Sequence, residues 1–200
     1  LKALLENKAQ ALSANRGKSI KETEKQVNEI LKQSGMPNAK VKIEQTVLKE
    51  LNKDGKDSIS LLFSANAGQP PAPVAKVASG GELSRIMLAI KSVLAKHTDL
   101  PTLIFDEIDT GVSGKIAEKM ANIMKEMGDN DRQVISITHL PQIAALGTTH
   151  YKVYKEDTSE ATISKMTILN KEERIKEIAQ MLSGENITDS AISHAKELLQ

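Results

Sequence analysis

A short apolar run in this chain ends in two adjacent carboxylates, Asp106 and Glu107. The run, residues 103–105, predicts a strand, and ligands of parallel α/β sheets bind beyond the carboxyl ends of strands. One carboxylate there can hold Mg²⁺ directly or through water. The other can orient or deprotonate a water molecule that attacks a phosphoryl group. The pair predicts magnesium-dependent phosphoryl chemistry. The alternative, which an acidic pair on its own would favour, is a capped strand end followed by two surface carboxylates without a function.

A serine and two glycines upstream, Ser79, Gly80 and Gly81, offer a place for phosphates. The glycines let the backbone approach a ligand closely. The serine can cap the helix expected at 83–97, and the free N–H groups at a helix start attract anions. The alternative is an ordinary N-cap after a proline-rich loop at 65–73. The acidic pair downstream favours the phosphate site.

A histidine, His139, follows the apolar run 134–138. At that strand end it can donate to a phosphate oxygen and sense bound nucleotide, whereas the alternative is a structural histidine. The run Gly17-Lys18-Ser19 is not a P-loop, because the glycine required five positions earlier is replaced by Leu12. These residues together predict one half of a nucleotide site without its phosphate-binding loop.

Composition excludes several other classes of protein. The 200 residues suit one domain, or one domain with an appendage. The net charge of +1 gives the chain no overall attraction to nucleic acid or to an anionic membrane. The absence of cysteine excludes disulfides and thiolate metal sites. No apolar run reaches the ~18 residues of a membrane span. Because the first residue is Leu1 rather than methionine, we expect a fragment of a longer chain.

The first half of the sequence predicts a long helix and then a hairpin. Residues 1–34 are rich in helix formers, and their apolar heptad spacing slips once near Gly17, as at the end of a coiled coil. Alternating residues at 41–47 and 58–63 predict two strands joined by a turn at Asp54-Gly55. The helix at 83–97 is expected to bury one apolar face, formed by Ile86, Met87, Ile90, Val93 and Leu94.

The second half predicts a parallel βαβ unit. Strands at 102–105 and 132–138 flank a helix at 111–127, and the second strand is apolar enough to be buried on both faces. The remaining expected elements are a short helix at 140–146, a hairpin from 151–155 and 162–169, and helices at 172–182 and 188–199.

The ordered set of Ser79-Gly80-Gly81-Glu82, residues 103–107, Asp109 and His139 resembles the C-terminal lobe of an ABC-type ATPase head. The glutamate of that first run, with a helix leading into the lobe, resembles the SMC group rather than transporters. Four longer runs resemble the RecN family of bacterial DNA repair proteins; these are residues 35–39, 77–85, 105–114 and 138–142.

This resemblance implies an α/β fold, the P-loop NTPase-like, ABC-type C-terminal lobe with a largely parallel sheet flanked by helices. It implies the end of a coiled coil at 1–35 and the lobe at 36–200. It also implies roles for single residues: Ser79, Gly80, Gly81 and Glu82 in the signature motif that touches ATP, Asp106 as the Mg²⁺ residue, Glu107 as the group that activates water, Asp109 in the D-loop at the dimer seam, and His139 as the switch histidine at the γ-phosphate.

The implied partners are an N-terminal head lobe of the same protein, a second copy in a head-to-head homodimer, and DNA. The implied cofactors are ATP and Mg²⁺, the implied location is the cytoplasm at the nucleoid, and no membrane is involved. Because the P-loop is missing, we expect this chain to be inactive alone.

The alternatives are a non-catalytic dimerisation module, another SMC-like head and a transporter subunit. An intact Glu107 argues against the dimerisation module, and the helix at 1–34 argues against the transporter subunit.

Overall fold

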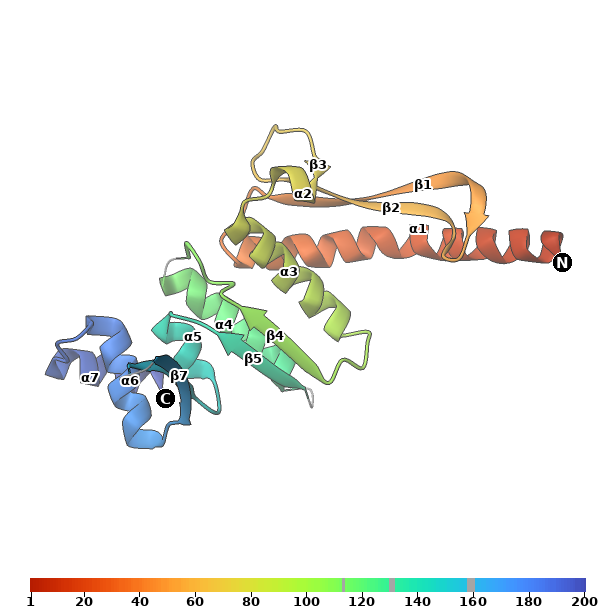
Figure 1. The fold of residues 1–200 in the computed structure, drawn as a ribbon. Coiled ribbons are helices and arrows are strands. Elements are labelled where there is room, and N and C mark those ends of the chain that lie inside the picture. The colour runs from red at the N-terminus through yellow and green to blue at the C-terminus, as the bar shows by residue number, and fades with distance from the viewer. Residues whose placement is uncertain (113, 130–131, 158–160) are drawn as a thin grey trace. The chain divides into compact units, whose positions relative to one another are not determined.

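The computed structural model describes residues 1–112, 114–129, 132–157 and 161–200, and it divides into two compact units (Figure 1). The first unit comprises Leu1–Leu100 and the second Pro101–Gln200. Each unit is described by itself below.

The first unit begins with the predicted long helix, α1, which spans Lys2–Gln33. The helix ends where the sequence predicts, because Gly35 adopts a left-handed φ of 83°. Two backbone bonds close this end: Met36 N–H donates to the Leu31 carbonyl at 3.0 Å, and Gly35 N–H donates to the Lys32 carbonyl at 3.3 Å. This pairing is a Schellman motif, which satisfies carbonyls that a helix end otherwise leaves open.

A long antiparallel hairpin follows, formed by β1 (Lys40–Asn52) and β2 (Gly55–Ser64). The predicted turn is confirmed, with Gly55 at a φ of 104°, a region that favours glycine. A two-residue strand, β3 (Ala72–Pro73), pairs with β2 inside the segment that the sequence predicts as loop. The three strands make one antiparallel sheet in the order β1-β2-β3.

Helix α1 lies along this hairpin, as Figure 1 shows, and side chains fasten the two together. Asn28 exchanges two hydrogen bonds with the backbone of Val41, at 2.7 and 3.0 Å. The Glu24 carboxylate accepts the Ile43 N–H at 2.6 Å. The apolar core of the unit joins α1, the hairpin and α3; its buried members are Val27, Leu31, Met36, Ala39, Val41, Phe63, Val74, Ile86, Ala89 and Val93. The C-terminal half of α1 is therefore part of a folded unit.

A buried carboxylate, Asp57, joins α1 to β2 nearer the hairpin turn. It accepts hydrogen bonds from the Ser13 hydroxyl at 2.7 Å, the Gln45 amide at 3.0 Å and the Arg16 guanidinium at 3.0 Å. The Ser13 and Gln45 bonds, together with the Arg16 charge, lower the pKa of Asp57 below its ordinary value of 3.8. These contacts therefore favour the ionised form of the Asp57 carboxylate.

A lowered carboxyl pKa stabilises the folded state above the unfolded pKa, and this stabilisation is lost as the pH falls through the folded pKa. We expect Asp57→Asn to lower the melting temperature at neutral pH, and the difference from wild type to shrink as the pH falls below 3.8. Thermal unfolding across an acid series measures this. The exposed turn residue Asp54 supplies the matched control, Asp54→Asn. A difference between wild type and Asp57→Asn that stays constant across the series would show that the Asp57 charge is unimportant.

The first unit ends with a short helix, α2 (Val74–Val77), and a longer one, α3 (Gly80–Ala95). Helix α3 begins three residues before the predicted start, because Ser79 already caps Gly80 and the following turn. Its predicted apolar face is correct for Ile86 and Val93, which are buried. It is wrong for Met87 and Leu94, which are exposed.

The second unit opens with the predicted βαβ arrangement. Strand β4 (Thr102–Asp106) pairs in parallel with β5 (Gln133–Ile137), and α4 (Gly114–Gly128) connects them and lies against β5. The register places Asp106 opposite Ile137, so both strands end at the same edge. Ser113, inside the predicted helix at 111–127, lies outside the described residues.

The prediction that the second of these strands is buried on both faces is wrong. Successive side chains of a strand point to opposite faces. On one face of the sheet, Leu103 and Phe105 of β4 are buried. On the other face, Ile135 and Ile137 of β5 are 40% and 52% exposed, and Ile104 of β4 is 54% exposed. An apolar run indicates that the side chains of a strand tend to be buried. It does not show whether residues of the same chain bury them.

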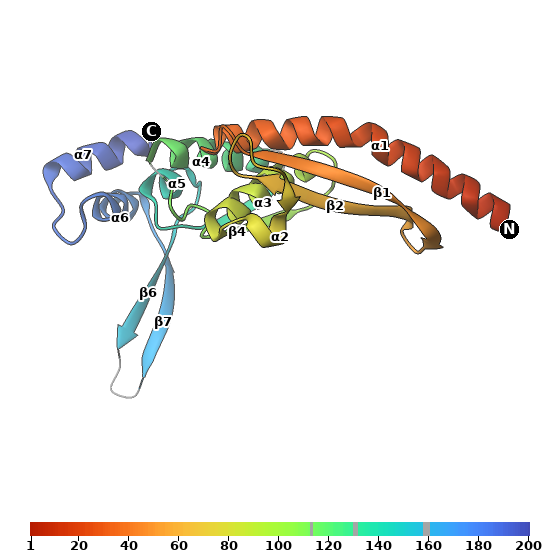
Figure 2. The same cartoon turned by 90° about the horizontal axis from the view of Figure 1, so that it is seen from above.

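The rest of the unit comprises α5 (Pro141–Leu146), a hairpin of β6 (Tyr151–Asp157) and β7 (Thr162–Ile168), and the helices α6 (Lys171–Ser183) and α7 (Asp189–Leu198). These match the predicted elements. Figure 2 shows the hairpin extending away from α5 and α6, and Lys152 of β6 contacts the Glu177 carboxylate of α6. Helices α5, α6 and α7 share a small core around Ala145, Ile178 and Ala195. No helix in the described part of the chain has the length and apolar character needed to cross a bilayer.

Candidate functional site

The start of α3 carries the serine–glycine turn of the first unit. The Ser79 hydroxyl accepts the Glu82 N–H at 3.4 Å, while Ser79 N–H and its hydroxyl each donate to the Glu82 carboxylate at 2.8 Å. This is a reciprocal capping box. The Ser79 backbone bond and then its hydroxyl bond lower the pKa of Glu82, which keeps the carboxylate charged at the positive end of the helix dipole. The sequence predicts the serine cap, but not the part that Glu82 plays in it.

Gly80 is exposed, and nothing lies within 4 Å of the position that a Cβ atom would take there. Its φ is not in the left-handed region, so the conformation does not require glycine either. The fold described here therefore gives no internal reason for this glycine, as expected where something outside the chain approaches the backbone closely.

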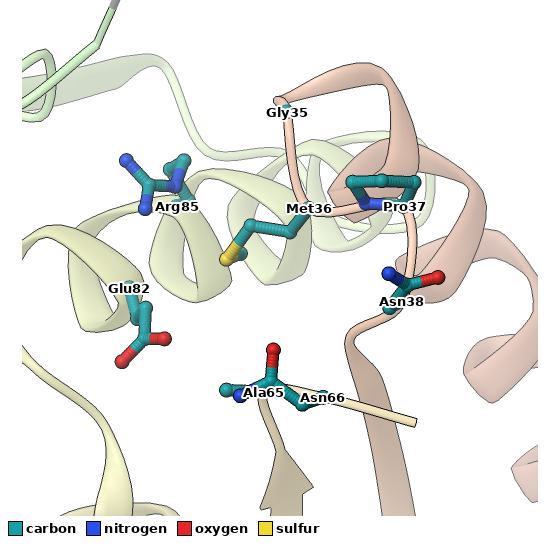
Figure 3. A pocket seen from close by; sticks show the side chains of 8 residues that line it. All are labelled: Gly35, Met36, Pro37, Asn38, Ala65, Asn66, Glu82 and Arg85. Carbon is teal, nitrogen blue, oxygen red and sulfur yellow. The ribbon is translucent and has the colours of Figure 1, made fainter.

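The same helix start borders a pocket of about 240 Å³ within the first unit (Figure 3). Its lining residues are Gly35, Met36, Pro37, Asn38, Ala65, Asn66, Glu82 and Arg85. Figure 3 shows the Met36 side chain reaching toward α3 between Glu82 and Arg85. Two runs that are separate in the sequence, 35–39 and 77–85, thus contribute residues to one pocket.

In the second unit, the predicted acidic pair lies at the carboxyl end of β4. Asp106 is the last residue of the strand and is exposed, as is Glu107. Glu107 has a φ of 45°, and among the residues that the structure describes it is the only non-glycine one with a positive φ. Its N–H donates to the Ile137 carbonyl at 3.0 Å, and its own carbonyl accepts the Thr110 hydroxyl at 3.1 Å. These two bonds hold a backbone conformation that costs a residue with a side chain about 1–2 kcal/mol.

The bond between Glu107 and Ile137 places the end of β5 next to the acidic pair. His139 follows two residues later, and its side chain is 63% exposed. The carboxyl edge of the parallel pair thus brings together Asp106, Glu107 and His139, which is the edge where ligands of such sheets bind.

Asp109 belongs to the same edge but differs from the other acids, because its residue is only 1% exposed. Its Oδ2 accepts a hydrogen bond from the Thr138 hydroxyl, and its Oδ1 lies 3.7 Å from His139 Nδ1. The side chain therefore has its contacts within its own unit. The sequence does not predict this contact, because a threonine at the end of a strand carries no distinctive spacing signal.

Mg²⁺ is usually bound through one or two carboxylates, several waters and the phosphates of the substrate. An exposed Asp106 at a strand end fits that mode. In the described residues no group of three or more histidine, aspartate or glutamate side chains could form an all-protein cage, and this mode of binding does not need one.

Sequence comparison relates this chain to the RecN proteins. It is 40% identical over 192 residues to the DNA repair protein RecN of Haemophilus influenzae, which covers 96% of this chain and 34% of that protein. The RecN of Vibrio cholerae is 41% identical over 192 residues, with the same coverage. The RecN of Bacillus subtilis is 44% identical over 151 residues, covering 76% of this chain and 26% of that protein. No protein-family model matches the sequence.

Structural comparison relates the fold to SMC heads. An Smc head domain with a coiled coil and joint from Pyrococcus yayanosii aligns with a TM-score of 0.62, at 19% identity, over 83% of this chain and 30% of that one. A chain from a study of ATP-driven dimerisation and DNA-stimulated activation of SMC ATPases aligns with a TM-score of 0.57, at 19% identity, over 87% of this chain and 99% of that one. These likenesses confirm the predicted fold class.

The matching region is about one third of the length of these RecN proteins, as it covers 34% of the first two. The chain is therefore a relative of the bacterial DNA repair protein RecN with the fold of an SMC-type ATPase head.

Proposed function

We propose that this chain is the C-terminal half of the ATP-binding head of a RecN-like protein, which acts in the repair of DNA double-strand breaks in the bacterial cytoplasm. A single observation carries the proposal: Asp106, the strained Glu107 and the exposed His139 share the carboxyl edge of β4 and β5. Strained backbone conformations cluster at functional sites, because the surrounding fold must hold them in place.

Each of these residues has a task in the hydrolysis of ATP. Asp106 would hold Mg²⁺, which supplies charge to neutralise the phosphates. Glu107 orients the attacking water and accepts its proton, since its side chain is exposed beyond the strand end. His139 donates a hydrogen bond to the γ-phosphate. The loop around Asp109 lies at the seam between two heads.

Ser79, Gly80, Gly81 and Glu82 act on the other face of the nucleotide, as part of the signature motif of the opposite head. The exposed start of α3, and a glycine that the fold itself does not require, suit a backbone that receives phosphate from outside the chain. The Glu82 carboxylate now holds the Ser79 N–H and hydroxyl, so phosphate must take over these donors when the heads engage.

The N-terminal lobe of the same protein is the partner that completes the sheet. Parallel sheets are normally covered on both faces. Ile104, Ile135 and Ile137 form an exposed apolar face on β4 and β5 that such a lobe would cover. That lobe would also bring the P-loop, and a second copy of the head would complete the ATP sandwich. DNA is the proposed partner of the whole assembly.

Isothermal titration calorimetry tests the division of the site. We expect this chain alone to bind Mg-ATP weakly or not at all, because the charged cradle of a P-loop is missing. The longer protein should bind Mg-ATP tightly. Micromolar binding by the isolated chain would contradict the proposal that half of the site lies elsewhere.

A further inference from the structure

One oxygen of the buried Asp109 carboxylate lacks a hydrogen bond. Its Oδ2 accepts from the Thr138 hydroxyl, but its Oδ1 is buried and has no hydrogen-bond partner in the described part of the chain. A buried carboxylate oxygen without a partner is costly, so such an atom calls for an explanation.

The nearest candidate donor is His139, whose Nδ1 lies 3.7 Å from this oxygen. That distance exceeds an ordinary N–H···O bond by less than 1 Å, so a small turn of the exposed ring would close it. The backbone on either side of the ring is held, because the Thr138 hydroxyl also accepts the Leu140 N–H at 3.0 Å. The imidazole can therefore rotate above a fixed carboxylate.

We propose that Asp109 is a positioning residue, which holds the His139 ring with Nδ1 protonated and directs Nε2 outward. An ionised carboxylate only accepts hydrogen bonds, so it selects the tautomer with the proton on Nδ1. The nitrogen that carries the proton in a histidine is set by the bond that the other nitrogen makes. With a proton on each ring nitrogen, Nδ1–H donates to Asp109 and Nε2–H can donate to a phosphate oxygen. This role of Asp109 rests on the proposed function of His139.

Nitrogen-15 NMR of the histidine side chains tests the proposal without nucleotide. In the wild-type chain at a pH where His139 is neutral, we expect its proton on Nδ1, and His139→Gln identifies the signal among the four histidines. Asp109→Asn should move the proton to Nε2, because a carboxamide can donate to Nδ1 instead. Glu118→Gln, an exposed acid on α4, is the control and should leave the tautomer unchanged.

A proton found on Nε2 in the wild-type chain would overturn the proposal, and this measurement does not depend on whether Asp109→Asn folds. An unchanged tautomer in a folded Asp109→Asn chain would overturn it equally. The result is independent of ATP binding, so it can fail while the proposed function stands. In the longer protein, Asp109→Asn should then lower kcat more than it changes KM for ATP, as expected when a group is misoriented rather than when binding is lost.

Discussion

Glu107→Gln in the longer protein is expected to slow ATP hydrolysis by about 10²- to 10⁴-fold, the usual contribution of a general base. The substitution keeps the size of the side chain and its hydrogen-bonding reach, but the amide cannot take a proton from water. The backbone bonds to Ile137 and Thr110 involve only main-chain atoms of Glu107, so they survive the change. ATP binding should therefore be retained.

Single-turnover kinetics and nucleotide binding, measured side by side, separate these two effects. Glu118→Gln makes the same chemical change at an exposed position of α4 and should hydrolyse ATP at the wild-type rate. Equal turnover by wild type and Glu107→Gln would remove Glu107 from the mechanism. Loss of ATP binding in Glu107→Gln would instead indicate that this side chain belongs to the binding site.

Ser79→Arg is expected to abolish ATP-dependent pairing of two heads that both carry the substitution. The arginine places a long, charged side chain at the exposed start of α3, where the proposed phosphate contact leaves no room for it. Loss of the N-cap should also cost about 1 kcal/mol of stability. Light scattering with and without ATP reports the pairing, and thermal unfolding shows whether the variant is folded.

Two further variants separate the causes of any loss of pairing. Ser79→Ala removes the cap without adding bulk, so it should lose the same stability but block pairing less completely. Ser60→Arg adds the same side chain at an exposed position on β2 and should pair normally. Normal ATP-dependent dimers of Ser79→Arg would refute the proposed contact.

Local patterns were sufficient to predict most of the elements of both units. The end of α1 at Gly35 and the turn at Gly55 were predictable because both glycines occupy left-handed conformations that other residues avoid. The parallel pairing of β4 and β5 followed from two apolar runs separated by a helix. In each case the information lies within a few neighbouring residues.

The errors come from contacts that sequence periodicity does not encode. The run at 132–138 is apolar throughout, yet Ile135 and Ile137 are exposed, since the number of strands beside β5 depends on tertiary structure. Met87 and Leu94 fit the helical spacing of Ile86 and Val93, but the core of the first unit reaches only part of that face. Hydrophobicity shows what tends to be buried, and packing decides which of those residues are.

The candidate site was predictable as a set of residues, but not in its supporting contacts. Asp106, Glu107 and His139 could be placed at one edge of the sheet, because the acidic pair and the histidine each come after an apolar run. The positive φ of Glu107 and the buried contact of Asp109 with Thr138 depend on how the two strand ends meet. These supporting contacts fix the orientation of the exposed groups.

The most direct test of the account mixes two defective variants of the longer protein, Ser79→Arg and Asp106→Asn. If each ATP lies between Asp106 of one head and Ser79 of the other, a mixed dimer contains one intact site, formed by Asp106 of the first variant and Ser79 of the second. We therefore predict that neither variant hydrolyses ATP alone and that the mixture recovers activity. A mixture that stays inactive although mixed dimers form, or a Ser79→Arg protein that hydrolyses ATP normally by itself, would contradict the account.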